Sequence, residues 1–245
     1  MQDDAMLEIA GVDVHYGQAH VLQGVSLSLG LAPVAVIGRN GMGKTTLCQS
    51  IMGLIAASAG SIRFAGTEIM RWPSYKIARL GLAIVPQGRR CFPSLTVDEH
   101  LRLVDKGRGR SWSIRPWTID RVYDTFPRLA ERKKNGGTQL SGGEQQMLAI
   151  SRALLTNPRY VIMDEPSEGL APVIVEHLIN VLKTLQADGI GLLLVEQKLA
   201  MATAVCNQVA IMVNGRIATT MSAEEIMSDE AAQRRYLGVA SSEQH

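Results

Sequence analysis

Short apolar runs alternate along the chain with segments in which apolar residues recur every three or four positions. Each run is typical of a buried strand in a parallel sheet, and the runs cover residues 34–37, 82–85, 160–163, 192–195 and 209–213. Helical spacing predicts helices over 45–55, 142–155 and 173–185. In the first helix we expect Leu47, Ile51 and Leu54 to share one buried face. This alternation predicts an α/β fold with a mainly parallel sheet covered on both faces.

The N-terminal part has shorter strands joined by turns. Residues 7–16 and 21–29 alternate partly between apolar and polar positions and flank a turn-like segment at 17–20. Another strand pair is predicted over 60–69, so we expect an antiparallel β subdomain beside the parallel sheet. Near the C-terminus, Asn214 and Gly215 form a strong hairpin signal, and a short helical tail follows.

Residues 89–134 differ in composition, with twelve basic and six acidic residues. Their apolar positions have roughly helical spacing, and residues 107–113 are expected to form a flexible break. We therefore predict an inserted α-helical subdomain over 89–155. Residues 1–88 and 156–245 form the surrounding core of a single domain over 1–245. We expect the basic subdomain to lie on the side that faces a membrane partner, although a solvated helical face explains the charge equally well.

Composition narrows the class of protein. Hydrophobic residues make up 46% of the 245 residues and charged residues 20%, which is typical of a folded chain. The net charge of +2 argues against a surface devoted to nucleic acid. Three well-separated cysteines suit a reducing compartment. No apolar run could cross a bilayer, and the acidic first residues do not resemble a signal peptide, so we expect a cytoplasmic protein without a membrane span.

Residues 38–45 match the phosphate-loop pattern GxxxxGKT between a predicted strand and a predicted helix. Glycines allow backbone N–H groups to turn toward phosphate oxygens, and the helix start adds its positive dipole end. Lysine offsets phosphate charge, and threonine offers a hydroxyl to Mg²⁺. The alternative is a glycine-rich turn that binds nothing. The candidate nucleotide ligands here are Gly38, Asn40, Gly41, Gly43, Lys44, Thr45 and Thr46.

Two carboxylates, Asp164 and Glu165, end the apolar run at 160–163. An aspartate at this place can hold Mg²⁺ through water, and the next carboxylate can orient or deprotonate an attacking water. Acidic strand ends are common, so the pattern by itself is weak. Together with the phosphate loop it predicts a nucleotide hydrolase.

Ser141, Gly142 and Gly143 open a predicted helix just before that strand. A hydroxyl and bare backbone N–H groups at a helix start favour a second phosphate site. The alternative is a well-capped helix without a ligand. One chain with one nucleotide loop has no evident use for a second phosphate site of its own.

The order of these features resembles the ATP-binding subunits of ABC transporters over nearly the whole chain. The resemblance implies a P-loop, RecA-like core that binds ATP and Mg²⁺. Two such domains pair head to tail, so residues 141–143 of one serve the ATP on the other. It also implies adenine stacking by Tyr16, catalytic roles for Glu165, Gln87 and Gln197, and Mg²⁺ coordination through Thr45, Gln87 and Asp164. Tyr16 could instead be an ordinary strand residue, and Gln87 a solvated loop residue.

A narrower resemblance is to the ATPase subunits that serve uptake of branched-chain amino acids, or of urea and short amides. The segments that carry it are 85–90, 92–97, 141–150, 165–172, 195–197 and 236–238. It implies two membrane-spanning permease subunits, a second related ATPase subunit and an extracytoplasmic solute-binding protein. It also implies a peripheral position on the cytoplasmic face of the inner or plasma membrane, with no nucleic-acid partner.

Three positions depart from the common ABC pattern. Gln197 stands where most ABC ATPases have histidine; it can hydrogen-bond a γ-phosphate but cannot carry a proton as imidazole does. Ala171 stands where many have aspartate, and Pro33 lies in a shortened turn.

Two functions are alternatives to an importer ATPase: a non-transport ABC ATPase that acts on nucleic acid or ribosomes, and an exporter ATPase. The transported solute and the choice between homodimer and heterodimer stay open.

Overall fold

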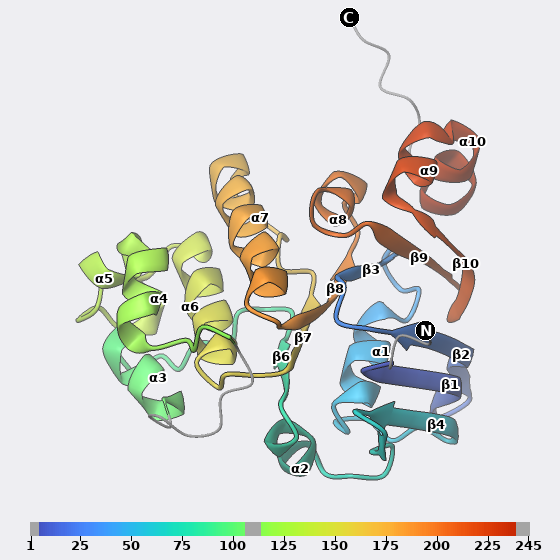
Figure 1. Ribbon diagram of the computed structural model, residues 1–245, viewed down its shortest axis with the longest axis horizontal. Coiled ribbons are helices and arrows are strands. Elements are labelled where there is room, and N and C mark those ends of the chain that lie inside the picture. Colours follow the sequence, from blue (N-terminus) through green and yellow to red (C-terminus); the bar gives the residue numbers. More distant parts are fainter. Residues whose placement is uncertain (1–4, 106–113, 239–245) are drawn as a thin grey trace, which may run out of the picture.

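The computed structural model describes residues 5–105 and 114–238, which form two sheets with helices around them (Figure 1). The larger sheet has six strands in the order β10-β9-β3-β8-β7-β6, and only the β9–β10 pair is antiparallel. Its strands are β3 (Val34–Ile37), β6 (Leu82–Val85), β7 (Tyr160–Asp164), β8 (Gly191–Glu196), β9 (Gln208–Val213) and β10 (Arg216–Ser222). The predicted α/β class and all five predicted buried strands are confirmed.

The smaller sheet is antiparallel, in the order β2-β1-β4-β5. Its strands are β1 (Leu7–Tyr16), β2 (Ala19–Leu29), β4 (Ala59–Phe64) and β5 (Thr67–Glu68). The predicted antiparallel part is therefore confirmed, although β2 begins two residues earlier than expected because Ala19 and His20 pair with Tyr16 and His15. The hairpin at Asn214 and Gly215 is also present and joins β9 to β10.

Ten helices are found in the described part of the chain. They are α1 (Lys44–Ile51), α2 (Ser74–Arg79), α3 (Val97–Val104), α4 (Ile119–Thr125), α5 (Pro127–Glu131), α6 (Gly142–Leu154), α7 (Pro172–Ala187), α8 (Leu199–Val205), α9 (Ala223–Ser228) and α10 (Glu230–Ala232). A 3-10 turn spans Gly137–Gln139, and a π-helical turn spans Gln233–Leu237. Within the described residues no helix has both the length and the apolar character needed to span a membrane.

One predicted helix is shorter than expected. The pattern predicted a helix to residue 55 with Leu54 on its buried face, but α1 ends at Ile51 and Leu54 is 54% exposed. The chain turns at Gly53, whose φ of 64° lies in the left-handed region that ends helices. A Cβ at this glycine would lie 2.4 Å from the carbonyl oxygen of Trp72, so the turn also lets two backbones approach closely.

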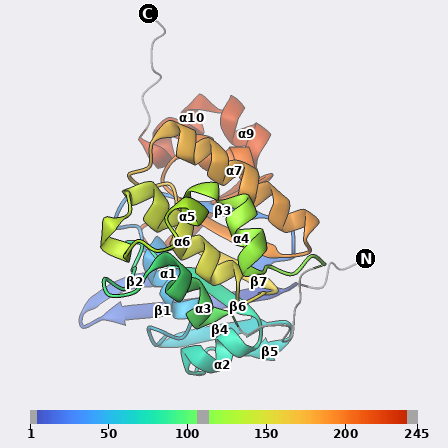
Figure 2. The same ribbon diagram turned by 90° about the vertical axis from the view of Figure 1, so that its left-hand side faces the viewer.

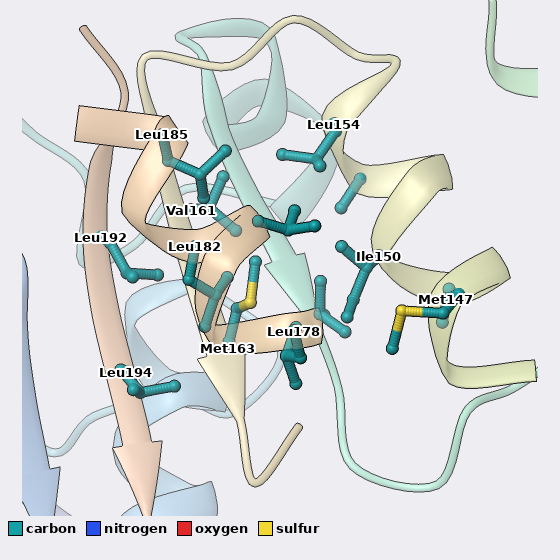
Figure 3. Close-up of a cluster of buried hydrophobic side chains, with 14 of the residues drawn as sticks. Met147, Ile150, Leu154, Val161, Met163, Leu178, Leu182, Leu185, Leu192 and Leu194 are labelled. Atoms are coloured by element: carbon teal, nitrogen blue, oxygen red, sulfur yellow. The ribbon is translucent and has the colours of Figure 1, made fainter. Parts of the chain in front are cut away.

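The six-stranded sheet separates two hydrophobic clusters because successive strand residues point to opposite faces. In β8, Leu193 and Val195 pack in the cluster that contains α1 and the antiparallel sheet, while Leu192 and Leu194 pack against α6 and α7. Figure 3 shows the second cluster, to which α6, β7, α7 and β8 all contribute. Ten of its residues are Met147, Ile150, Leu154, Val161, Met163, Leu178, Leu182, Leu185, Leu192 and Leu194.

The chain between β6 and β7 contributes α3, α4, α5 and α6, which gather on the side turned to the viewer in Figure 2. Asn157 joins this group to the core, because it accepts a hydrogen bond from the Trp117 amide at 2.6 Å and donates to the Trp117 carbonyl at 2.9 Å. Buried Asp188 adds ion pairs with Arg115, at 3.1 Å, and with Arg121. The break predicted at 107–113 lies outside the described residues.

Candidate functional site

The phosphate loop follows β3, which lies between β8 and β9 in the middle of the sheet. Two of its glycines show why this residue type is needed there. A Cβ at Gly38 would lie 2.4 Å from the Met212 carbonyl oxygen, and Gly43 has a φ of 100°. Gly43 precedes α1 without a side-chain cap, so the first-turn N–H groups of α1 stay available to an anion.

The loop opens on a cavity of about 400 Å³. It brings together three segments that are far apart in sequence: the phosphate loop, the end of β6 and the end of β7. The lining residues are Val21, Asn40, Gly41, Gly43, Lys44, Thr45, Thr46, Gln87 and Glu165. Eight of these nine were candidates from sequence; Val21 was not, because nothing in its local pattern marks it.

Lys44 lies at the floor of this site and is only 4% exposed. Its ammonium donates to the carbonyls of Gly38 at 2.8 Å and Arg39 at 3.0 Å, and it pairs with Glu165 Oε1 at 3.0 Å. An ammonium has three protons, so these three acceptors use its whole donor capacity. A phosphate oxygen that binds Lys44 must compete with one of them, and Glu165 is the only carboxylate among the three.

Asp164 and Thr45 form the second pair in the site. Asp164 is 2% exposed, and Thr45 Oγ1 donates to its Oδ1 at 3.3 Å. Burial, with the neighbouring Glu165 charge, raises the pKa of Asp164 to about 6, against the opposing effects of the Thr45 hydrogen bond and Lys44. One hydroxyl and one carboxylate are hard oxygen donors of the kind that hold Mg²⁺ together with phosphate oxygens. The donor set therefore fits Mg²⁺.

Glu165 has a backbone that side chains rarely adopt, with a φ of 48°. Its amide donates to the Val195 carbonyl at 2.8 Å, which holds the turn against β8. A non-glycine residue in this region costs about 1 kcal/mol or more and tends to occur at functional positions. The turn aims the carboxylate at Lys44 and Gln87, whose Nε2 lies 3.5 Å from Glu165 Oε2.

Gln87 connects this cavity to its surroundings. Its amide donates to Glu168 Oε2 at 2.8 Å, a stronger contact than the one to Glu165. Glu165 and Glu168 also line a neighbouring cavity of about 420 Å³, together with Gly88, Arg89, Gln145, Gln146 and Gly169. Glu168 was missed from sequence because its partner Gln87 is brought to it only by the pairing of β6 with β7.

Ser141, Gly142 and Gly143 begin α6 away from the phosphate loop. Ser141 accepts a hydrogen bond from the Glu144 amide at 3.3 Å, and Glu144 accepts one from the Ser141 amide at 2.7 Å. A Cβ on Gly142 would lie 2.4 Å from the Arg89 guanidinium, so that side chain covers the glycine. None of the three residues lines the cavity at Lys44.

Tyr16 and Gln197 are likewise not brought into that cavity. Tyr16 ends β1 and is 50% exposed, and Gln197 follows β8 and is exposed. The residue before it, Glu196, is 2% exposed and was missed, although an acid that directly follows the apolar run 192–195 is a detectable signal. Ala171 is the N-cap of α7 and supplies no side-chain cap.

Comparisons with known proteins, by family model, by sequence and by structure, all lead to the same family. The family model described as ABC transporter matches residues 22–168. The chain is 37% identical to the high-affinity branched-chain amino acid transport ATP-binding protein BraG of Pseudomonas aeruginosa, covering 95% of this chain and 100% of that protein. It is 32% identical to the lipopolysaccharide export system ATP-binding protein LptB of Haemophilus influenzae, covering 91% and 93%. A nucleotide-free ATP-binding cassette from an ABC transporter superposes with a TM-score of 0.80 at 24% identity, covering 96% and 99%.

Proposed function

The chain belongs to the ABC transporter family of ATP-binding subunits, and from that premise we propose that it energises uptake of branched-chain amino acids or of urea and short amides. That it is the ATPase of a transporter follows from the family. The importer role is our inference. It is carried by the 37% identity to BraG across nearly the full length of both chains.

The proposed chemistry assigns one task to each group in the cavity. Lys44 and the α1 amides bind the phosphates, while Thr45 and Asp164 hold Mg²⁺, which offsets phosphate charge. Glu165 accepts a proton from the attacking water. The 3.0 Å Lys44–Glu165 pair supports this assignment of roles, because a phosphate that binds Lys44 in place of Glu165 frees Glu165 to act as a base.

We further propose that a second ATPase subunit completes each site. Residues 141–143 offer a capped helix start that does not reach this chain's own phosphate loop. A facing chain can use them on its nucleotide, and Tyr16 and Gln197 lie on exposed surface from which they can close on the base and the γ-phosphate. The related partner is a different ATPase, as in the uptake family that the chain resembles.

The permease is proposed to dock in a cavity of about 480 Å³ beside β6. Pro86 lines this cavity and the next residue, Gln87, lines the phosphate-loop cavity, so neighbouring residues of one loop border both. Four arginines surround an apolar floor: Arg79, Arg89, Arg90 and Arg152. Within the described residues none of the four has an ion pair with an acid, and Arg152 Nε is buried without a hydrogen-bond partner. This charge favours a permease segment with acidic side chains.

Reconstitution tests the importer role. The genes next to this one should encode two permeases and a solute-binding protein, and the complex in liposomes should take up the ligand of that binding protein when ATP is present on the ATPase side. Leucine, isoleucine, valine, urea and acetamide are the solutes to compare. Outward transport, or uptake of none of these solutes, would refute the proposal.

The docking surface is tested separately by reversing charge. Arg79→Glu combined with Arg90→Glu should abolish co-purification with the permeases but leave ADP affinity within about twofold, because neither residue lines the phosphate-loop cavity. Lys183→Glu, an exposed change on α7, is the matched control. Normal assembly of the double variant would place the permease elsewhere.

An exporter role is the second candidate, because the chain is also 32% identical to LptB of Haemophilus influenzae. An exporter does not need an extracytoplasmic binding protein. Neighbouring genes for permeases without a binding protein, together with outward transport in vesicles, would favour this candidate over the importer.

A further inference from the structure

A buried carboxylate lies at the end of β8, outside the cavity described above. Glu196 is 2% exposed and does not line the cavity at Lys44. Alternation along β8 places its side chain on the sheet face that α6 and α7 cover, as for Leu194. Asp164 lies two residues after Ile162 in β7, so its side chain points to the same face as Ile162, the opposite face, toward α1. The two buried acids are therefore separated by the sheet.

The carboxylate of Glu196 joins two loops that are far apart in sequence. Its Oε1 accepts the Ser167 amide at 3.0 Å, and its Oε2 accepts the Gln197 amide at 3.2 Å. The Lys198 amide is a third donor. Ser167 lies in the loop after β7 that begins with Glu165, while Gln197 and Lys198 begin the loop after β8.

A buried acid at this position costs free energy of desolvation that an apolar residue would not cost. Its presence therefore suggests a task that an apolar residue cannot perform. Four apolar residues precede it in β8, and another would continue the buried strand. Burial raises the pKa of Glu196, and the hydrogen bonds from Ser167 and the two following amides oppose the rise. Without the carboxylate, the buried amide of Ser167 would lose its hydrogen-bond partner and stay desolvated.

We propose that Glu196 is a positioning residue that holds the loop of Glu165 and the loop of Gln197 as one unit. The inference rests on the roles proposed above for these two residues. Because one carboxylate bonds both loops, a displacement of Gln197 on contact with the γ-phosphate is transmitted to the loop that carries Glu165. The hydrogen bond from the Glu165 amide to the Val195 carbonyl ties the start of the Glu165 loop to β8, next to Glu196.

Amide hydrogen exchange in the nucleotide-free chain tests the connection itself. Glu196→Gln keeps the size of the side chain but turns an NH₂ toward one of the loops, so both loops should exchange about tenfold faster or more. The peptides to follow cover residues 165–170 and 196–200. Glu196→Asp is a second variant that keeps the charge but is too short to span both loops, and it should also lose protection. Glu176→Gln, an exposed change on α7, is the control.

Unchanged exchange in both peptides, or a change confined to the loop of Gln197, would overturn the proposal. ATPase kinetics then test the consequence. Glu196→Gln should lower kcat about tenfold or more while the KM for ATP stays within about twofold. In a Gln197→Ala background the same change should cost less than about twofold in kcat, because the side chain that contacts the γ-phosphate is then missing. Equal losses in the two backgrounds would show a merely structural role. A fully active Gln197→Ala variant would refute the proposed contact of Gln197 with the γ-phosphate, and the exchange result would still decide whether Glu196 joins the loops.

Discussion

Asp164→Asn should stabilise the nucleotide-free protein at neutral and alkaline pH. The carboxylate is 2% exposed, and its pKa is raised from 3.8 to about 6, chiefly by burial. A shift of about two units corresponds to about 3 kcal/mol, since each unit is worth 1.36 kcal/mol. Asparagine carries no charge and keeps an Oδ1 that can accept the Thr45 hydrogen bond, so it removes the cost of ionisation and little else.

The direction of the pH dependence follows from proton binding. Between the unfolded pKa of 3.8 and the folded value of about 6, the native state binds more protons than the unfolded state. The contribution of Asp164 to the free energy of unfolding is therefore fully present below this window and is lost as pH rises through it. The variant should exceed the parent by about 3 kcal/mol at about pH 8, and the difference should shrink toward zero near pH 4.

Urea unfolding followed by circular dichroism, in EDTA and at fixed temperature from about pH 4 to pH 8, measures this difference. Buried His100, whose pKa is lowered, contributes the opposite trend to both proteins and cancels in the comparison. Asp98→Asn is a control of opposite sign: hydrogen bonds from Arg102 and Tyr123 lower the pKa of Asp98, so this change should destabilise above about pH 5. An advantage of Asp164→Asn that is equal at every pH, or absent at pH 8, would refute the reasoning.

Other expected outcomes concern the same site and the core. Lys44→Ala should abolish hydrolysis and weaken ADP binding about tenfold or more, because a buried cation is lost; calorimetry and a phosphate-release assay measure both, and near-normal turnover would contradict the assignment. Glu165→Gln should lower turnover about 100-fold or more yet bind Mg²⁺-free ADP more tightly, since Lys44 is no longer paired with a carboxylate; weaker ADP binding would count against that competition. Ser141→Arg should leave the ADP affinity of its own chain within about twofold but stop turnover in the assembled transporter, and full activity there would remove residues 141–143 from the site. Leu182→Ala should cost about 2–5 kcal/mol in urea unfolding, whereas exposed Val173→Ala should change little; equal effects would contradict the assigned core.

Local pattern determined much of the fold. The strands at 34–37, 82–85 and 209–213 were predicted from apolar runs because a fully buried strand leaves a continuous signal in a few adjacent residues. The phosphate loop could be identified for the same reason, since its glycines, Lys44 and Thr45 are contiguous. The pattern could not reveal α2, in which only Ile77 is buried, because one apolar residue has no period.

Only the tertiary structure decided which distant groups meet. Lys44 pairs with Glu165 because β3 and β7 both flank β8, an order of strands that differs from their order along the chain. The same order brings Ser167 to Glu196, and the pairing of β6 with β7 brings Gln87 to Glu168. Apolar periodicity determines which residues of each element are buried, because that depends on local geometry. Which strands become neighbours depends on how all the buried faces pack together, and that is a property of the whole chain.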